Sequence, residues 1–267
     1  MPVVPVNGIK LSYDDHGSGE PVVMVTGTAA PGRIWRTHQV PALKAAGYRV
    51  VTVDNRGIPP TDAGPQSYTV DDMAADVAGL IEHLGAGPCR VVGFSLGGII
   101  VAELLLARPE LVRQAVLIAS CGRADALIAA MAAADLALAD SGGALPPAYA
   151  AYAQAIQNLS PETLNDEERL RDWLAVFELS GAAPGSVRDQ LGLQLIGDRL
   201  PAYRRIGVPC HVIGFADDLV ARPHLVREVA TAIPGAGYTE ISGCGHFGCL
   251  EKPDAVNEAM TGFFTPS

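Results

Sequence analysis

The stretch Val91–Ile100, with the sequence VVGFSLGGII, limits the fold of this chain more than any other. Its first valines are typical of a buried strand, and the apolar residues Ile99–Ala107 predict a core helix. Ser95 therefore lies on the turn that joins the strand to the helix. Gly93 and Gly97 suit such a turn, because the backbone there is strained and leaves no room for a neighbouring side chain.

Gly-x-Ser-x-Gly between a strand and a helix is the pattern of a nucleophile elbow. The turn would expose the hydroxyl of Ser95, and the helix that starts there would direct unpaired N–H groups at bound negative charge. The alternative is that Gly93 and Gly97 serve only a tight turn and that Ser95 is an N-cap residue. The pattern alone does not distinguish a nucleophile from an N-cap residue. The positions of other residues in the chain are needed to distinguish them.

The rest of the chain alternates between expected strands and helices, which predicts an α/β fold: a mainly parallel, twisted sheet with helices on both faces. An Asn-Gly pair between the first two strands predicts a hairpin. The expected strands are Val3–Val6, Ile9–Asp14, Pro21–Thr26, Arg49–Val53, Arg90–Val92, Ala115–Ala119, Val208–Ile213 and Tyr238–Ile241. The expected helices outside the elbow are Trp35–Ala46, Thr69–Leu84, Pro223–Ala232 and Pro253–Phe264.

One long segment breaks this alternation. Residues 122–205 are rich in alanine and show no strand pattern, and we expect about four helices there, one of them over Asp166–Leu179 behind an N-cap at Ser160. An insertion between two strands of an open sheet is expected to cover the carboxyl ends of the strands, where such sheets bind ligands. We therefore predict a core in two parts, residues 1–121 and 206–267, and a helical lid formed by residues 122–205.

Composition excludes several classes of function. The formal net charge of −10 and the pI near 5.0 leave no basic surface for nucleic acid or for an anionic membrane. Neither a signal peptide nor an apolar run of membrane length is present, so we expect a cytoplasmic protein. The five cysteines are scattered and lack Cys-x-x-Cys spacing, so we expect reduced thiols and no zinc. We also expect no other metal and no cofactor.

A serine hydroxyl becomes a good nucleophile when a base accepts its proton and an acid fixes the tautomer of that base. Of the six histidines, only His246 follows the last expected strand, and it lies in the glycine-rich loop 243–248. The acid should follow the strand Val208–Ile213, where Asp217 and Asp218 stand side by side. Both aspartates lie on a loop at the carboxyl edge of the sheet, so both remain open.

The chain resembles the α/β-hydrolase fold superfamily over nearly its full length. The motifs that carry this resemblance are Gly93-x-Ser95-x-Gly97-Gly98, Asp54-x-Arg56-Gly57 and Gly245-His246, all in the expected order. The segment Pro21–Gly27 together with Trp35 is similar to the strand and loop that form the oxyanion hole of this family. Within the superfamily, the chain looks most like lid-bearing esterases, lactonases and cofactor-free haloperoxidase-type perhydrolases.

The resemblance implies that Ser95 attacks, that His246 is the general base, and that the backbone N–H groups of Thr28 and Leu96 form the oxyanion hole. The segment that begins at Asp218, DLVARP, is similar to the family's Asp-Pro-Val-Thr-Pro-Pro, which favours Asp218 as the acid of the triad. The common Gly-x-x-Asp spacing, counted from Gly214, instead points to Asp217, so the alternative stays open at this stage.

The chain also departs from the family pattern. Thr26-Gly27 replaces the usual His-Gly, and residues 58–61 carry prolines where the family has a second glycine. We interpret Asp54 and Arg56 as structural, ion-pairing residues. We expect aromatic side chains to line the substrate pocket, although each could instead belong to the core; they are Trp35, Phe94 and Phe247.

These residues predict a serine hydrolase that cleaves a carboxylic ester, a thioester or a lactone through an acyl-enzyme, with a small acyl compound as its partner. Alternatives that use the same site are perhydrolysis, C–C bond cleavage and cyclisation of a bound intermediate. A non-catalytic ligand receptor is the alternative from another class. The sequence does not determine the oligomeric state, and a homo-oligomer is one of the open alternatives.

Overall fold

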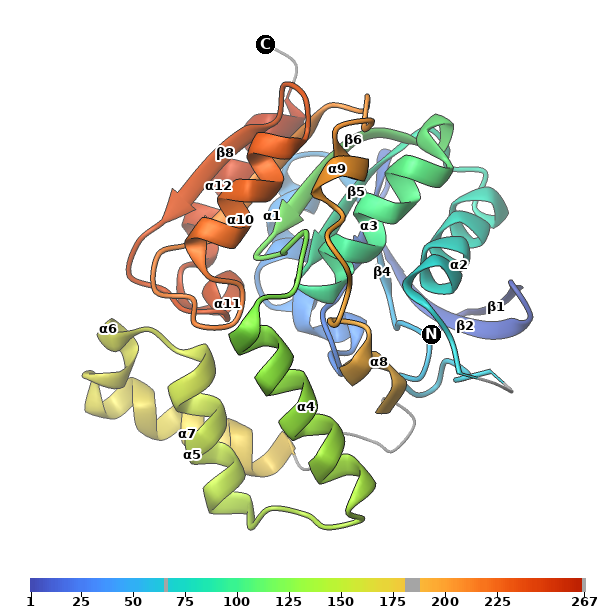
Figure 1. Cartoon of the computed structure of the whole chain (residues 1–267). Coiled ribbons are helices and arrows are strands. Elements are labelled where there is room, and N and C mark those ends of the chain that lie inside the picture. Colours follow the sequence, from blue (N-terminus) through green and yellow to red (C-terminus); the bar gives the residue numbers. More distant parts are fainter. Residues whose placement is uncertain (65–66, 181–187, 266–267) are drawn as a thin grey trace.

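A computed structural model describes residues 1–64, 67–180 and 188–265. In these residues, eight strands form one sheet in the order β1-β2-β4-β3-β5-β6-β7-β8, at the centre of the molecule (Figure 1). The strands are β1 (Val3–Val6), β2 (Ile9–His16), β3 (Glu20–Val25), β4 (Tyr48–Val53), β5 (Cys89–Phe94), β6 (Val112–Ile118), β7 (Cys210–Phe215) and β8 (Gly237–Ile241).

The sheet is antiparallel at one edge and parallel elsewhere. β1 and β2 form a hairpin around Asn7-Gly8, and β2 pairs antiparallel with β4. All pairings from β4 through β3 to β8 are parallel. All six residues of β5 are buried, as expected for a strand that helices cover on both faces. The predicted mainly parallel α/β sheet is confirmed.

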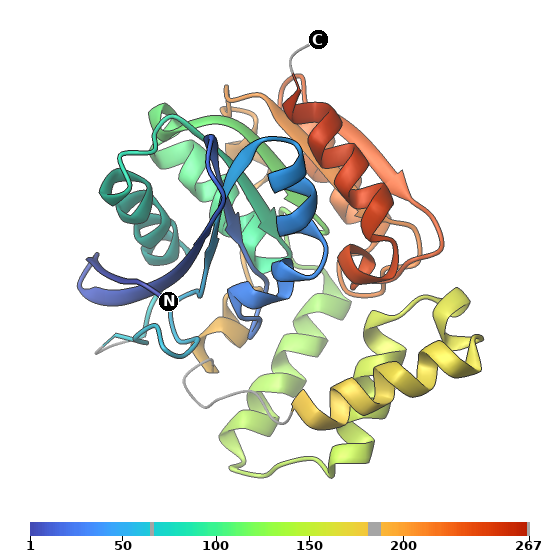
Figure 2. The same ribbon diagram turned by 180° about the vertical axis from the view of Figure 1, so that it is seen from behind.

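Helices cover both faces of the sheet (Figure 2). α2, α3 and α10 lie on one face, and α1 and α12 pack against each other on the opposite face. Nearly every residue of α3 is buried, because this helix also contacts α2 and the short helix α9 (Leu200–Tyr203). The helices are α1 (Gln39–Ala45), α2 (Val70–His83), α3 (Leu96–Ala107), α10 (Pro223–Ala232), α11 (Gly248–Glu251) and α12 (Pro253–Phe264).

The helix predicted over Trp35–Ala46 is wrong in its first four residues. A 3-10 turn, η1 (Gly32–Arg36), comes first, and the α-helix begins only at Gln39. Pro41 gives the physical reason, because proline lacks an N–H and collides with the preceding turn when it lies inside a helix. A start at Gln39 places Pro41 in the first turn, where its missing N–H costs nothing.

Between β6 and β7 the described residues form helices and no strand. Figure 1 shows α4 to α7 as a separate layer beyond one end of the sheet, whereas α9 lies beside α3 and α10. The sequence predicts about four helices, and six are present in the described part, because three have only four or five residues and leave no measurable periodicity. They are α4 (Ala126–Asp140), α5 (Pro147–Asn158), α6 (Pro161–Leu164), α7 (Glu167–Ser180), α8 (Arg188–Gly192) and α9 (Leu200–Tyr203).

Ser160 is an N-cap residue, as predicted, but it caps α6 rather than the longer helix that follows. Its hydroxyl accepts the N–H of Thr163 at 3.2 Å. α7 has its own start, where the carboxylate of Asp166 accepts the N–H of Arg169 at 3.1 Å. Two capping side chains so close together produce two helices in place of the single one expected.

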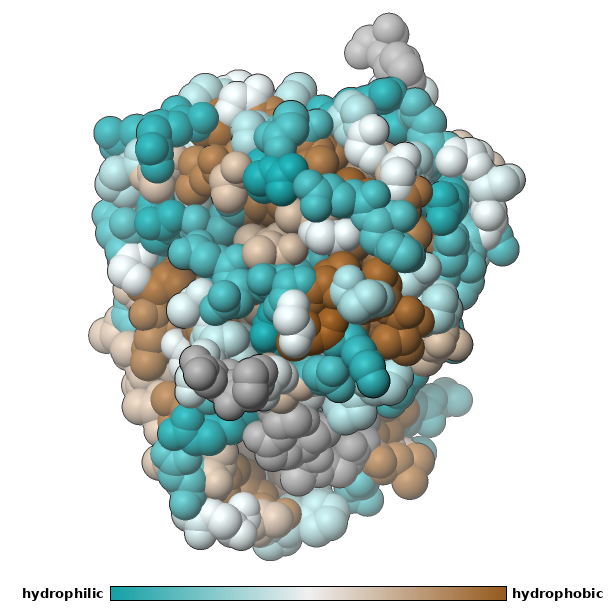
Figure 3. Space-filling view, turned by 90° about the vertical axis from the view of Figure 1, so that its right-hand side faces the viewer, coloured by the Kyte–Doolittle hydropathy of each residue, from teal (hydrophilic) through white to brown (hydrophobic). Residues whose placement is uncertain are grey.

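The surface mixes polar and apolar residues. Figure 3 shows the face at the right of Figure 1, where hydrophilic residues cover most of the area and hydrophobic ones form separate patches. In the layer of α4 to α7, apolar side chains such as Tyr149, Tyr152 and Leu179 are exposed. Across residues 1–64, 67–180 and 188–265, no helix combines the length and the apolar character that crossing a membrane requires.

Candidate active site

Ser95 lies between the last residue of β5 and the first residue of α3, with φ of 54° and ψ of −120°. This region of backbone space is costly for a residue with a side chain. The glycines beside it have no room for one: a Cβ on Gly93 would lie 2.3 Å from the carbonyl oxygen of Gly97, and a Cβ on Gly97 would lie 2.3 Å from that of Val25. The predicted elbow is present, with the strand and the helix in direct backbone contact.

Three side chains from distant parts of the sequence meet at the elbow. Nε2 of His246 lies 3.1 Å from Oγ of Ser95, and Nδ1 of the same ring lies 2.8 Å from Oδ2 of Asp218. His246 and Asp218 are 5% and 2% exposed, so water hardly competes for these contacts. This order of hydroxyl, imidazole and carboxylate is the geometry that activates a serine.

The structure distinguishes the two neighbouring aspartates. Oδ1 of Asp218 accepts the N–H groups of Val220 and Ala221 at 2.7 and 2.8 Å, which leaves Oδ2 directed at His246. Asp217 is half-buried, and its backbone N–H donates to the carbonyl of Cys244 at 3.2 Å. Among the described residues, the carboxylate that meets His246 is that of Asp218.

The loop that carries His246 is fastened on both sides of the histidine. The N–H of Gly245 donates to Oε2 of Glu251 at 2.7 Å, and the N–H of Phe247 donates to the carbonyl of Asn158 at 3.1 Å. Oε1 of Glu251 also accepts the N–H and the hydroxyl of Ser160, at 3.0 and 2.8 Å. Glu251 carries no signal in the sequence, since a glutamate looks like an ordinary surface residue until its burial is known.

The two expected oxyanion donors belong to α3 and to the loop after β3. Leu96 is the first residue of α3, so its N–H has no partner inside the helix. Thr28 belongs to the loop after β3, which passes so near that a Cβ on Gly27 would lie 3.0 Å from Cβ of Ser95. Thr26, the residue that replaces the family's histidine, bonds through its hydroxyl to the carbonyl of Ala30 at 2.7 Å.

A small pocket of about 20 Å³ opens beside Ser95, room for about one water-sized group. Its walls come from α3, from the residues that follow β6 and β7, and from the segment between these two strands. Most of the lining is apolar, and Ser120, Arg123 and Gln194 add polar groups. The apolar and small lining residues besides Ser95 are Leu96, Ile99, Ala119, Cys121, Ile128, Ile196, Val220 and Ala221.

None of the three aromatic residues expected in the pocket lines this cavity. Trp35 is fully buried in the core and meets the ring of Phe94 edge to face, with centroids 6.2 Å apart. Phe94 also contacts the ring of His246, at 5.0 Å between centroids. Phe247 packs against Trp173 of α7, at 6.1 Å. The expectation for Trp35 is corrected: its side chain supports the site from the core.

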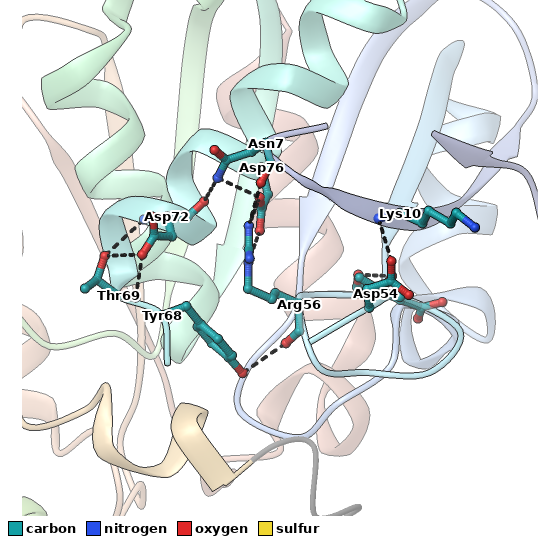
Figure 4. Close-up of polar contacts among 10 residues, drawn as sticks. Asn7, Lys10, Asp54, Arg56, Tyr68, Thr69, Asp72 and Asp76 are labelled. Carbon is teal, nitrogen blue, oxygen red and sulfur yellow. Dashed lines mark hydrogen bonds and ion pairs between the residues drawn. The ribbon is translucent and has the colours of Figure 1, made fainter. Parts of the chain in front are cut away.

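Arg56 and Asp54 both have structural contacts, as interpreted, but only Arg56 forms an ion pair with a described residue. Arg56 forms a buried ion pair with Asp76 of α2, with contacts of 2.6 and 2.8 Å, and Asn7 donates to the same carboxylate at 3.0 Å (Figure 4). Asp54 makes no ion pair with a described residue and instead accepts the N–H of Gly32 at 2.8 Å. Burial raises the pKa of Asp54, and the hydrogen bond from Gly32 opposes this shift.

The five cysteines are all buried and unpaired. Burial raises the pKa of the Cys121 and Cys244 thiols to about 12, so thiolate is scarce at neutral pH. Three or more His, Cys, Asp or Glu side chains do not gather into a metal-binding group anywhere in the described ranges.

Comparison with known proteins places the chain in a family. A family model described as the alpha/beta hydrolase family matches residues 22–259. The chain belongs to the alpha/beta hydrolase family. Its sheet order, its elbow and its hydrogen-bonded serine, histidine and aspartate agree with this membership.

Several members of the alpha/beta hydrolase family are similar over the whole chain. BpoC of Mycobacterium tuberculosis, named as a candidate non-heme bromoperoxidase, is 48% identical over 258 residues, which are 96% of this chain and 98% of BpoC. Its crystal structure has a TM-score of 0.92 at 47% identity and 95% coverage of both chains. RutD of Azorhizobium caulinodans, named as a candidate carbamate hydrolase, is 29% identical over 98% of both chains. The enol-lactonase of Burkholderia xenovorans LB400 has a TM-score of 0.87 at 25% identity, with 99% of this chain and 100% of that chain covered.

Proposed function

We propose that this protein is a serine hydrolase that cleaves a carboxylic ester, a thioester or a lactone through an acyl-enzyme. The observation that carries the proposal is the hydrogen-bonded series Ser95, His246 and Asp218 at the elbow. Membership of the alpha/beta hydrolase family supports it.

The chemistry follows from these contacts. His246 takes the proton of Ser95 at Nε2 while Oγ attacks the carbonyl carbon, and the oxyanion that forms accepts the N–H groups of Thr28 and Leu96. Such donors are commonly worth about 3 kcal/mol each in the transition state. His246 then gives the proton to the leaving group, which leaves an ester on Ser95. Water attacks this ester with the same histidine as base, and Asp218 holds the tautomer and stabilises the imidazolium.

The pocket limits the size of the group that it accepts. The cavity beside Ser95 is small and most of its lining is apolar, which favours a short, uncharged acyl group. Residues 122–205 act as a lid in this proposal, since Ile128 and Gln194 of this segment belong to the pocket wall. The partner is accordingly a small acyl compound.

A second use of the same site is perhydrolysis, in which hydrogen peroxide replaces water in the attack on the acyl-enzyme and releases a peracid. The observation in its favour is the similarity to BpoC, whose name refers to a bromoperoxidase. Both reactions pass through the same acylated Ser95. Comparing product formation with and without peroxide at saturating ester separates them.

Ser95 is tested by substitution and by covalent trapping. Wild type should release a burst of nitrophenol from p-nitrophenyl acetate, and mass spectrometry after treatment with a fluorophosphonate should find the label on Ser95. Ser95→Ala should lower turnover at least a thousandfold with an unchanged melting temperature, because alanine fits the same turn. Ser141→Ala, on an exposed loop, is the matched control and should behave like wild type. Wild type without burst or label would contradict the proposal and favour a ligand receptor.

A further inference from the structure

Two glutamines from the segment between β6 and β7 reach the loop after β3, residues 26–30, called the oxyanion loop below. Gln190 of α8 is fully buried, and its Oε1 accepts the N–H of Ala29 at 2.9 Å. Four residues later, Nε2 of Gln194 donates to Oγ1 of Thr28 at 3.0 Å. Two consecutive residues of the oxyanion loop are therefore held by a segment about 160 residues away.

Gln190 uses both ends of its amide. While Oε1 contacts the oxyanion loop, Nε2 donates to the carbonyl of Arg56 at 2.7 Å. The buried amide thus joins the loop after β3 to the loop after β4. Because both of its polar atoms have partners, the side chain is held in one orientation.

The hydrogen bond to Ala29 acts where the backbone is strained. Ala29 has φ of 57°, a left-handed conformation that a residue with a side chain adopts only when its surroundings impose it. Its N–H belongs to the peptide group that follows Thr28, so the acceptor on Gln190 fixes the orientation of that peptide. Gln194 holds the Thr28 side chain at the same time. The N–H of Thr28 is the proposed oxyanion donor. Gln190 restricts the peptide group after Thr28, and Gln194 restricts the Thr28 side chain.

We propose that Gln190 is a positioning residue for the hydrolysis: it holds the oxyanion loop in the shape that aims the Thr28 N–H at the developing oxyanion. It acts through Ala29 and touches neither substrate nor reacting atoms. This inference rests on the proposed function, because it assigns a role within the same reaction. α8 packs against α4, and Ile128 of α4 lines the pocket beside Ser95 (Figure 1). The helices that line the pocket are therefore in contact with the helix that holds the oxyanion loop.

Gln190→Met tests the proposal, since methionine has a similar length but offers neither hydrogen bond. Removing one oxyanion donor outright costs about a hundredfold to a thousandfold in kcat. A donor that is present but badly aimed should cost less, so we expect kcat for p-nitrophenyl acetate to fall roughly tenfold to a hundredfold with KM nearly unchanged. The midpoint of the pH profile should stay where it is, because His246 and its contacts are untouched.

A thionoester gives a readout that general loosening of the protein would not move. Sulfur accepts hydrogen bonds more weakly than oxygen, so a well-aimed oxyanion hole favours the ester over the thionoester of the same acid. This preference should shrink in Gln190→Met. Gln190→Glu keeps an acceptor for the Ala29 N–H, but it replaces the donor to the Arg56 carbonyl with a carboxylate oxygen or, when protonated, with an O–H group. Its kcat and its preference should therefore lie between those of Gln190→Met and wild type. Should Gln190→Met fail to fold, the ester preference of Gln190→Glu provides the test: a smaller preference than in wild type supports the inference, and a wild-type preference overturns it.

Gln157→Met is the matched control, since Gln157 lies on α5 away from the oxyanion loop, and it should match wild type in both readouts. If Gln190→Met had the kcat and the ester preference of wild type, the inference would be overturned. The proposed function would be unaffected, because it depends on the burst and on the label at Ser95. A higher KM with an unchanged preference would also overturn it, because Gln190 would then support only substrate binding. Absence of the burst in wild type would instead count against the proposed function itself.

Discussion

Asp218 and His246 are joined by a contact of 2.8 Å, although 28 residues separate them, and the carboxylate is fixed from its other side by two backbone N–H groups. Asp217, one residue earlier, makes a backbone hydrogen bond to Cys244 instead. The pair of aspartates therefore offers a matched comparison, in which one carboxylate touches the imidazole and its neighbour does not.

Asp218→Asn should lower kcat on an activated ester by about ten-thousandfold, because the amide no longer holds the tautomer that accepts the serine proton. Asp217→Asn should stay within a few-fold of wild type. The measurement is kcat between pH 7 and 8 for both variants. The assignment would be reversed by a loss of activity confined to Asp217→Asn, and full activity in both variants would place the acid on another strand.

Ile128→Ala should change the preferred acyl length. The side chain comes from α4, is 6% exposed and lines the pocket beside Ser95, so its truncation enlarges a small cavity. Butyrate should gain about tenfold in kcat/KM relative to acetate, in the range that a methylene group commonly contributes to discrimination. The variant should also lose roughly 2 to 5 kcal/mol of stability.

Leu127→Ala is the control for Ile128→Ala, because Leu127 is the neighbouring residue of the same helix and is 43% exposed. Its acyl preference should equal that of wild type over a panel of nitrophenyl esters from acetate to octanoate. An identical panel for Ile128→Ala and wild type would show that the pocket does not bind the acyl group.

Glu251→Gln should destabilise the loop that carries His246. The carboxylate accepts three hydrogen bonds, from Gly245 and from the N–H and hydroxyl of Ser160, and an amide would turn an NH₂ group toward one of these donors. A buried donor without an acceptor costs about 1 to 3 kcal/mol. Urea unfolding should show this loss, and kcat should fall because the backbone next to His246 moves.

Glu162→Gln gives the comparison for Glu251→Gln. Glu162 contacts Lys252 at 2.6 Å on the surface, and exposed ion pairs contribute little to stability. Its unfolding midpoint and kcat should match wild type. If Glu251→Gln behaved in the same way as Glu162→Gln, the buried carboxylate would have no role in positioning the histidine.

Asp54→Asn should become more stable relative to wild type as the pH rises. Burial raises the pKa of Asp54 above its ordinary value of 3.8, so the unfolded chain loses this proton at a lower pH than the folded protein does. The contribution of Asp54 to stability is therefore complete below pH 3.8, the ordinary pKa, and is lost as the pH rises through the raised pKa of the folded protein. Its Oδ2 has no hydrogen-bond partner among the described residues.

The measurement for Asp54→Asn is urea unfolding of both proteins between about pH 4 and pH 7. The variant keeps an oxygen for the Gly32 N–H and carries no charge, so its stability relative to wild type should rise steadily across this pH range. A difference in stability that stays constant across this pH range would show that Asp54 does not titrate as proposed.

The sequence by itself determined the features that depend on near neighbours in the chain. Glycines two residues either side of Ser95 predicted the elbow, because only a residue without a side chain tolerates the backbone contact there. The expected helix Thr69–Leu84 is present as α2, and the capping box at its start joins Thr69 to Asp72, only three residues away. The strand and helix alternation likewise predicted the parallel sheet.

Only the tertiary structure decided which distant side chains meet. The family resemblance favours Asp218 and the Gly-x-x-Asp spacing points to Asp217, and the turn after β7 places the Asp218 carboxylate against His246. Gln190 and Glu251 resemble surface residues until the fold buries them, and their contacts span 161 and 91 residues. Periodicity and spacing describe the backbone over a few residues, whereas a hydrogen bond across the molecule depends on where whole elements pack, and that is set by the folded chain as a unit.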